Sequence, residues 1–163
     1  MVTTTPQRQN TRPRSALASC ARTLYCDAPS YLGAAEGICM LVRHFLMQIS
    51  MPHLVFSTEL IIRECLNNAI QHGNAEDPAK RVKVEVSSTR NAIRIRVADE
   101  GNGFPWKTLR PRRVADGACS GRGLRMIAAY ASRIAFNSKG NVITVDITDK
   151  TMRRTTQWPQ LIG

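Results

Sequence analysis

The most constraining feature of this sequence is a change in its hydrophobic period near residue 80. Residues 29–49 and 54–72 repeat apolar side chains at helical spacing, which predicts two helices that each bury one face. Residues 82–86 and 93–97 instead alternate Val or Ile with charged side chains. That period of two predicts a pair of half-buried strands joined by a polar turn, an antiparallel hairpin.

The remaining segments complete a pattern of helices and strands. We expect a first strand around residues 22–26, a third helix over 124–132, and two last strands near 133–137 and 142–148. Helices on one face of a mixed, mostly antiparallel sheet make an α+β fold, a two-layer α/β sandwich.

The length of 163 residues suits one domain, which we place at residues 19–150. Residues 1–18 are polar and basic and predict a disordered tail, and residues 151–163 form a C-terminal tail. No run approaches the roughly 18 uncharged apolar residues of a membrane span, and no signal peptide is evident. We therefore expect a cytoplasmic protein without membrane attachment.

The five cysteines and the net charge of +11 limit the classes of function. No Cys-x-x-Cys pair occurs, so neither a zinc site nor a disulfide framework is indicated. Six of the basic residues fall between Lys107 and Arg125, and such a cluster attracts phosphate or an acidic surface. Aromatic residues are few and not interleaved with the cations, which argues against single-stranded nucleic acid as a partner.

The segment ECLNNAIQHGN, residues 64–74, places amides, an acid and an imidazole on one side of the second predicted helix. A solvated helix face is the simpler interpretation of this segment alone. Two adjacent asparagines are nevertheless poor helix formers. Glu64 and Asn68 are also spaced i,i+4, so both reach one small ligand. Oxygen ligands of this kind suit Mg²⁺ and an ordered water.

Two glycine motifs follow, and each is weak evidence alone. DEGNGF puts Asp99 at a strand end, with Gly101 and Gly103 free to approach a ligand or to form an ordinary turn. SGRGLRMI puts Gly121 and Gly123 at the start of a helix, where free amides favour an anion. A simple hinge and helix cap would look the same.

In this order the three motifs resemble those of the Bergerat-fold ATP-binding superfamily, which includes gyrases and histidine kinases. Over residues 22–149 the sequence is most similar to the bacterial anti-sigma factor serine/threonine kinases. ECLNNAIQHGN looks like their N box, DEGNGF like their G1 box and GRGLRMI like their G2 box.

The resemblance implies a role for each matching residue. Asn68 would hold Mg²⁺ on the triphosphate, and Glu64 would be the catalytic acid that orients or deprotonates the nucleophile. Asp99 would accept a hydrogen bond from the adenine amino group, assisted through water by Thr144. Further nucleotide-binding positions implied by the match are Gly101, Gly103, Gly121, Arg122, Gly123 and Leu124.

The implied activity is that of a protein kinase that uses ATP and Mg²⁺. Its substrate would be a serine of an anti-anti-sigma protein with a STAS domain, and it would sequester a sigma factor as a homodimer. A switch kinase that binds no sigma factor, a non-catalytic ATP-dependent binding module, a plain ATPase and a nucleic-acid-binding protein stay open as alternatives.

Overall fold

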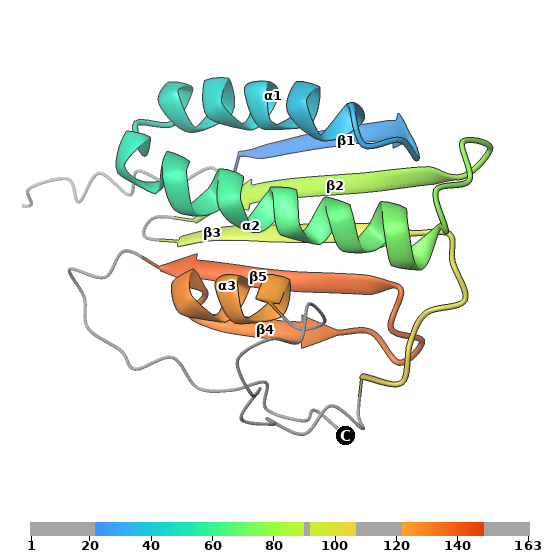
Figure 1. Cartoon of the computed structure of the whole chain (residues 1–163). Helices are drawn as coiled ribbons and strands as arrows, with labels where there is room; N and C mark the ends of the chain where they lie inside the picture. The colour runs from blue at the N-terminus through green and yellow to red at the C-terminus, as the bar shows by residue number, and fades with distance from the viewer. Residues whose placement is uncertain (1–21, 90–91, 107–121, 149–163) are drawn as a thin grey trace, which may run out of the picture.

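The computed structural model describes residues 22–89, 92–106 and 122–148. In these ranges three α-helices cover one face of a five-stranded sheet (Figure 1), which confirms the predicted two-layer α+β fold. The predicted tails, 1–18 and 151–163, lie outside the described residues.

The strands are arranged in the order β1-β2-β3-β5-β4, and every pairing among them is antiparallel. No parallel pair occurs in the part of the chain that the structure describes, so this sheet is antiparallel throughout. The strands are β1 Thr23–Pro29, β2 Arg81–Ser88, β3 Ala92–Asp99, β4 Arg133–Phe136 and β5 Val142–Thr148.

The helices occupy the predicted segments with shifted ends. They are α1 Ala34–Gln48, α2 Val55–Asn67 and α3 Arg122–Tyr130, with a 3₁₀ turn at Pro52–Leu54 and a π-helical turn at Asn68–Gly73. The prediction that Pro29 and Ser30 open the first helix was wrong. Pro29 instead ends β1 in register with Arg81, and the Ser30 amide donates to the carbonyl of Lys80.

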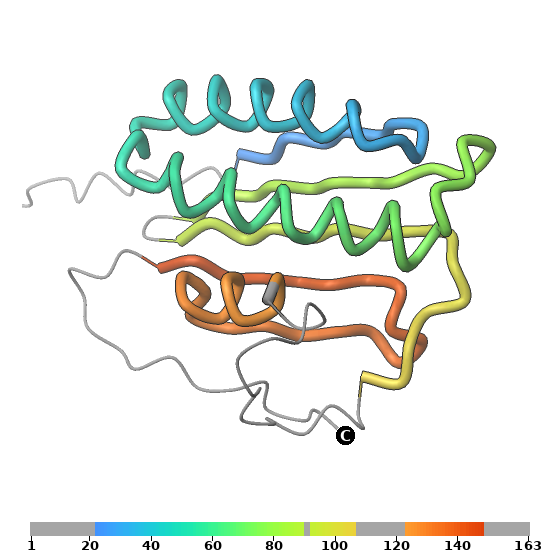
Figure 2. The backbone as a smooth tube through the Cα atoms, in the orientation of Figure 1, coloured from blue at the N-terminus to red at the C-terminus, as the bar shows by residue number. Residues whose placement is uncertain are grey.

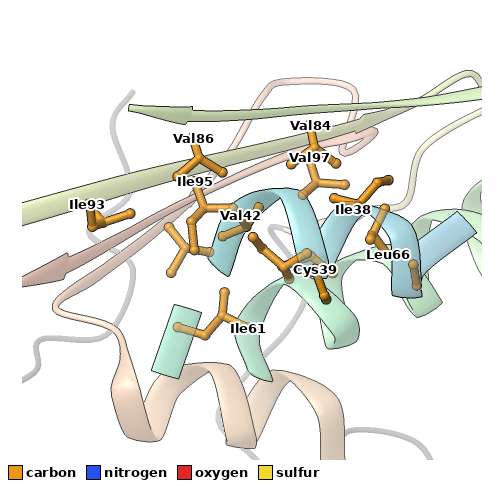
Figure 3. Packing of buried hydrophobic residues seen from close by; sticks show 14 of the residues in the cluster. Ile38, Cys39, Val42, Ile61, Leu66, Val84, Val86, Ile93, Ile95 and Val97 are labelled. Atoms are coloured by element: carbon orange, nitrogen blue, oxygen red, sulfur yellow. The ribbon is translucent and has the colours of Figure 1, made fainter. Parts of the chain in front are cut away.

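The alternation of Val and Ile puts one face of the central hairpin into the core. Val84 lies opposite Val97, and Val86 opposite Ile95, in the β2–β3 register. These side chains are almost fully buried and pack against α1 and α2 (Figure 3). Full burial of an aliphatic side chain contributes about 1.5–3 kcal/mol, so this layer fixes α2 over the sheet.

The other face of the sheet carries the charged members of the alternation. Arg94 and Asp146 form a two-bonded ion pair across β3 and β5, and Arg81 pairs with Asp27 across β2 and β1. Such exposed pairs contribute at most about 1 kcal/mol each, so the core decides the register. None of the described helices is long and apolar enough to span a membrane.

Candidate nucleotide-binding site

A pocket of about 430 Å³ lies where α2 ends, between the π-helical turn and the ends of β3 and β5. Its walls are mainly apolar and include Cys65, Val97 and Ile143. Burial raises the pKa of the Cys65 thiol, so this side chain is a neutral part of the wall. Pockets of this size with mainly apolar walls and a few polar groups are typical of small-molecule binding sites.

Asp99 supplies a carboxylate to this pocket at the end of β3. The Gly101 amide donates to its Oδ1 over 2.8 Å, which fixes the side chain. Half-burial raises the pKa of Asp99, and the Gly101 hydrogen bond and Lys139 oppose that rise. The carboxyl therefore presents an acceptor in a poorly solvated place, as recognition of a ligand N–H group requires.

Gly73 and Gly101 let the chain segments around Asp99 come together closely. A methyl group at Gly73 would overlap the Asp99 carboxyl carbon, and one at Gly101 would overlap the Gly73 carbonyl oxygen. Gly101 does not line the pocket. It packs against the π-helical turn and so supports the pocket wall from outside. The buried Asn74 also joins these segments, donating to the Arg81 carbonyl and accepting from the Glu100 amide.

Asn141, which the sequence analysis did not single out, lines the pocket beside Asp99. Its Nδ2 donates to the Asp99 carbonyl over 2.8 Å, and the Asp99 amide donates to the Asn141 carbonyl over 3.0 Å. Asn137 orients Asn141 by donating from its Nδ2 to the Asn141 Oδ1. The turn NSKGN, residues 137–141, can be recognised in the sequence. Its position next to Asp99 could not be predicted, because it depends on the pairing of β3 with β5.

Thr144 does not reach the pocket. It is paired in register with Arg96, which is exposed on the face of the sheet away from the helices. Its neighbour Ile143 lines the pocket instead, because successive side chains on a strand point to opposite faces. The expectation that Thr144 assists Asp99 is therefore wrong, and Asn141 occupies that position.

Gly103 and two aromatic residues form the outer wall. Gly103 has φ +76°, and a methyl group there would overlap the Lys139 carbonyl, so the loop lies directly on the β4–β5 turn. The next residue, Phe104, meets Phe136 edge to face with centroids 5.2 Å apart. Both rings line the pocket, where they offer an apolar surface to a flat ligand.

The π-helical turn changes the direction of the polar side chains that follow Asn67 in ECLNNAIQHGN. In it the Asn74 amide donates to the Ala69 carbonyl, five residues back, so the α-helical spacing assumed for the polar stripe ends at Asn68. Asn68 and His72 line the pocket, whereas Gln71 is exposed and does not. Single π-turns inside helices often occur at functional sites.

Glu64 and Asn68 meet the first turn of α3 at Gly123. A methyl group at Gly123 would lie 2.6 Å from Oε2 of Glu64 and 3.7 Å from Nδ2 of Asn68. The absence of a side chain at Gly123 therefore lets α3 approach both polar groups. Gly123 and Leu124 line the pocket, while Glu64 lies just beside it.

Several predicted phosphate-binding residues fall outside what the structure describes. Gly121 precedes the described part of α3, and of Arg122 only the helical backbone is described. The basic residues between Lys107 and Arg113 are also outside the described ranges. Of the cations at the start of α3, Arg125 is described and is exposed.

Comparison with known proteins agrees with this geometry. The model of the histidine kinase-like ATPase domain family matches residues 13–147. The chain thus belongs to the histidine kinase-like ATPase domain family, whose members bind ATP. No curated protein sequence matches it.

The residues of the pocket fit this nucleotide. The apolar walls and Asp99 suit a purine ring with an amino group, and the start of α3, where Gly123 and Leu124 line the pocket, suits an anion as helix N-termini do. No cluster of three or more His, Cys, Asp or Glu able to hold a metal occurs among the described residues. Mg²⁺ bound to a nucleotide is held mainly by phosphate oxygens and waters, with only one or two protein carboxylates, so this family does not require a protein metal cage.

Proposed function

We propose that this protein is an ATP-dependent protein serine/threonine kinase of the anti-sigma factor type. The observation that carries the proposal is that Glu64 lies against Gly123 and Asn68, two residues that line the pocket. An acid beside the phosphate end of the pocket is what the transfer of a phosphoryl group to a hydroxyl needs.

Each residue has a distinct task in this proposal. Asp99 accepts a hydrogen bond from the adenine amino group, while the apolar walls exclude water from the base. Asn68 holds Mg²⁺, which neutralises charge on the triphosphate when bound. Glu64 accepts the proton of the incoming serine hydroxyl, and its position one helical turn from Asn68 keeps base and phosphate together.

The proposed substrate is a serine of a STAS-domain anti-anti-sigma protein, and the proposed second partner is a sigma factor held by a homodimer of this chain. Support comes from the resemblance of ECLNNAIQHGN, DEGNGF and GRGLRMI to the motifs of anti-sigma kinases. A switch kinase would show the same pocket and bind no sigma factor, so a pull-down of purified sigma factors separates the two roles.

The proposal is tested by incubating the chain with γ-labelled ATP, Mg²⁺ and purified STAS-domain proteins. We expect labelled phosphoserine on a STAS-domain protein, and a rate about 10²–10⁴-fold lower for Glu64→Gln. Glu59→Gln is the matched control, because Glu59 lies on the same helix but pairs with Arg43 on α1. ATP hydrolysis without transfer, or an unchanged rate in Glu64→Gln, would contradict the proposal.

A further inference from the structure

Asn141 is a second polar residue at the Asp99 end of the pocket. In Figure 2 the chain that leaves β3, drawn in yellow, passes beside the orange turn between β4 and β5. Two hydrogen bonds join these segments, one from Asn141 Nδ2 to the Asp99 carbonyl and one from the Asp99 amide to the Asn141 carbonyl. Both residues line the pocket, so the carboxamide of Asn141 lies where a ligand that contacts Asp99 would meet it.

The orientation of the Asn141 carboxamide follows from its contact with Asn137. Oδ1 of Asn137 accepts three backbone N–H groups over 2.8 to 3.2 Å, those of Gly140, Asn141 and Val142. Only the oxygen of an amide side chain accepts such bonds, so Nδ2 of Asn137 must be the group that faces Asn141. It donates to Oδ1 of Asn141 over 2.8 Å. The Asn141 oxygen is thereby bonded to the turn, and its Nδ2 group is the end that faces Asp99.

Asn141 keeps one hydrogen-bond donor for a ligand. Its Nδ2 group carries two hydrogens, and one of them is given to the Asp99 carbonyl. Next to the carboxylate of Asp99, which only accepts, the pocket wall therefore offers one N–H group. A ligand that excludes water from this wall must place an acceptor there, because a buried donor without a partner is costly.

We propose that Asn141 is a specificity-determining residue that donates a hydrogen bond to the ring nitrogen N1 of adenine. This role rests on the proposed function, which places the adenine amino group at Asp99. N1 is an acceptor beside the carbon that carries the amino group, on the edge of the base farthest from the ribose. Guanine and hypoxanthine have an oxygen in place of the amino group and a hydrogen on N1. They would oppose Asp99 with an acceptor and Asn141 with a donor, so the two side chains together select adenine.

The test is a calorimetric titration of wild type and Asn141→Leu, in the presence of Mg²⁺, with ATP and two analogues. In 1-deaza-ATP a C–H group replaces N1, and 7-deaza-ATP is the matched analogue with the same change at N7. Wild type should bind 1-deaza-ATP about tenfold or more weakly than ATP, because the Asn141 donor is left without a partner. In Asn141→Leu the two affinities should be equal. The ratio for 7-deaza-ATP should be the same in both proteins.

Two further variants complete the comparison. Asn141→Ala should also bind ATP and 1-deaza-ATP equally, and it serves as the second variant if Asn141→Leu folds poorly. Ser138→Ala is the control, because Ser138 lies in the same turn, is exposed and does not line the pocket. It should keep the wild-type preference for ATP over 1-deaza-ATP.

Purine riboside triphosphate, which lacks the amino group, separates a contact with the base from an effect through Asp99. The backbone hydrogen bond from Asp99 to Asn141 does not involve the Asn141 side chain, so Asp99 should still recognise the amino group in Asn141→Leu. Wild type and Asn141→Leu should then prefer ATP over this analogue by the same ratio. Loss of that preference in Asn141→Leu would overturn the direct contact, because Asn141 would act only by holding Asp99.

The outcomes separate the role of Asn141 from the proposed function. Failure of the wild-type chain to bind ATP overturns both. Binding of ATP and 1-deaza-ATP with equal affinity by wild type, or with an unchanged ratio in both Asn141 variants, overturns the role of Asn141 alone. Absence of phosphoryl transfer to any STAS-domain protein, with the expected preference for ATP over 1-deaza-ATP, overturns the kinase function and supports the role of Asn141.

Discussion

At the scale of single residues, the position of Asp99 in the pocket wall has a cost in stability. Its carboxyl is half-buried, and burial raises its pKa above the ordinary aspartate value. The folded chain therefore binds the Asp99 proton more tightly than the unfolded chain does. It follows that the free energy of unfolding falls as the pH rises from the ordinary aspartate pKa through the raised folded value.

Asp99→Asn should for this reason stabilise the ligand-free protein at pH 7. The amide keeps an oxygen for the Gly101 N–H group and carries no charge to desolvate. Thermal unfolding of both proteins should give a higher Tm for the variant at pH 7. The difference should shrink near pH 3, where both side chains are neutral. A variant that is less stable than wild type at pH 7 would contradict this account of Asp99.

At the scale of elements, the close contact of α3 with α2 brings Gly123 beside Glu64 and Asn68 at the edge of the pocket. The contact depends on Gly123, where even one methyl group would meet Oε2 of Glu64. Glycine is a poorer helix former than alanine, so Gly123 lowers the stability of the first turn of α3 while it allows the close approach to Glu64 and Asn68.

Gly123→Ala should therefore separate stability from activity. We expect unfolding at an equal or higher denaturant concentration, together with a phosphoryl transfer rate reduced about tenfold or more, because Glu64 or α3 must move. Gly37→Ala on α1 is the matched control, since nothing lies within 4 Å of its added methyl group. It should stabilise the chain by up to about 1 kcal/mol without affecting transfer. Full activity in Gly123→Ala would show that the contact has no role.

At the scale of the whole molecule, the sequence predicted the layers and the central strands because each depends on a local period. The alternation at 82–86 and 93–97 was sufficient for the hairpin, and the helical spacing of 54–72 for α2. The π-helical turn at Asn68–Gly73 could not be predicted in this way, since it arises from contacts of Gly73 and Asn74 with β2 and β3.

The pocket was predicted less completely than the fold. Glu64, Asn68 and Asp99 belong to motifs that can be seen in the sequence, and the structure brings them to one end of the sheet. Asn141 and Phe136 could not be recognised, because they reach the pocket only through the pairing of β5 with β3 and β4. The error at Thr144 has the same origin, since a strand side chain can be assigned to a face only when the register is known.

We propose that one pocket binds the base at Asp99 and the metal-bound phosphates at Asn68. Calorimetric titration with ATP and Mg²⁺, and separately with adenosine, tests this proposal. The proteins to compare are wild type, Asp99→Asn, Asn68→Ala and the control Asn67→Ala, because Asn67 does not line the pocket. Asp99→Asn should weaken both ligands about tenfold or more, which is about 1.4 kcal/mol. Asn68→Ala should weaken only ATP, and Asn67→Ala neither. ATP affinity that is unchanged in both Asp99→Asn and Asn68→Ala would contradict the account.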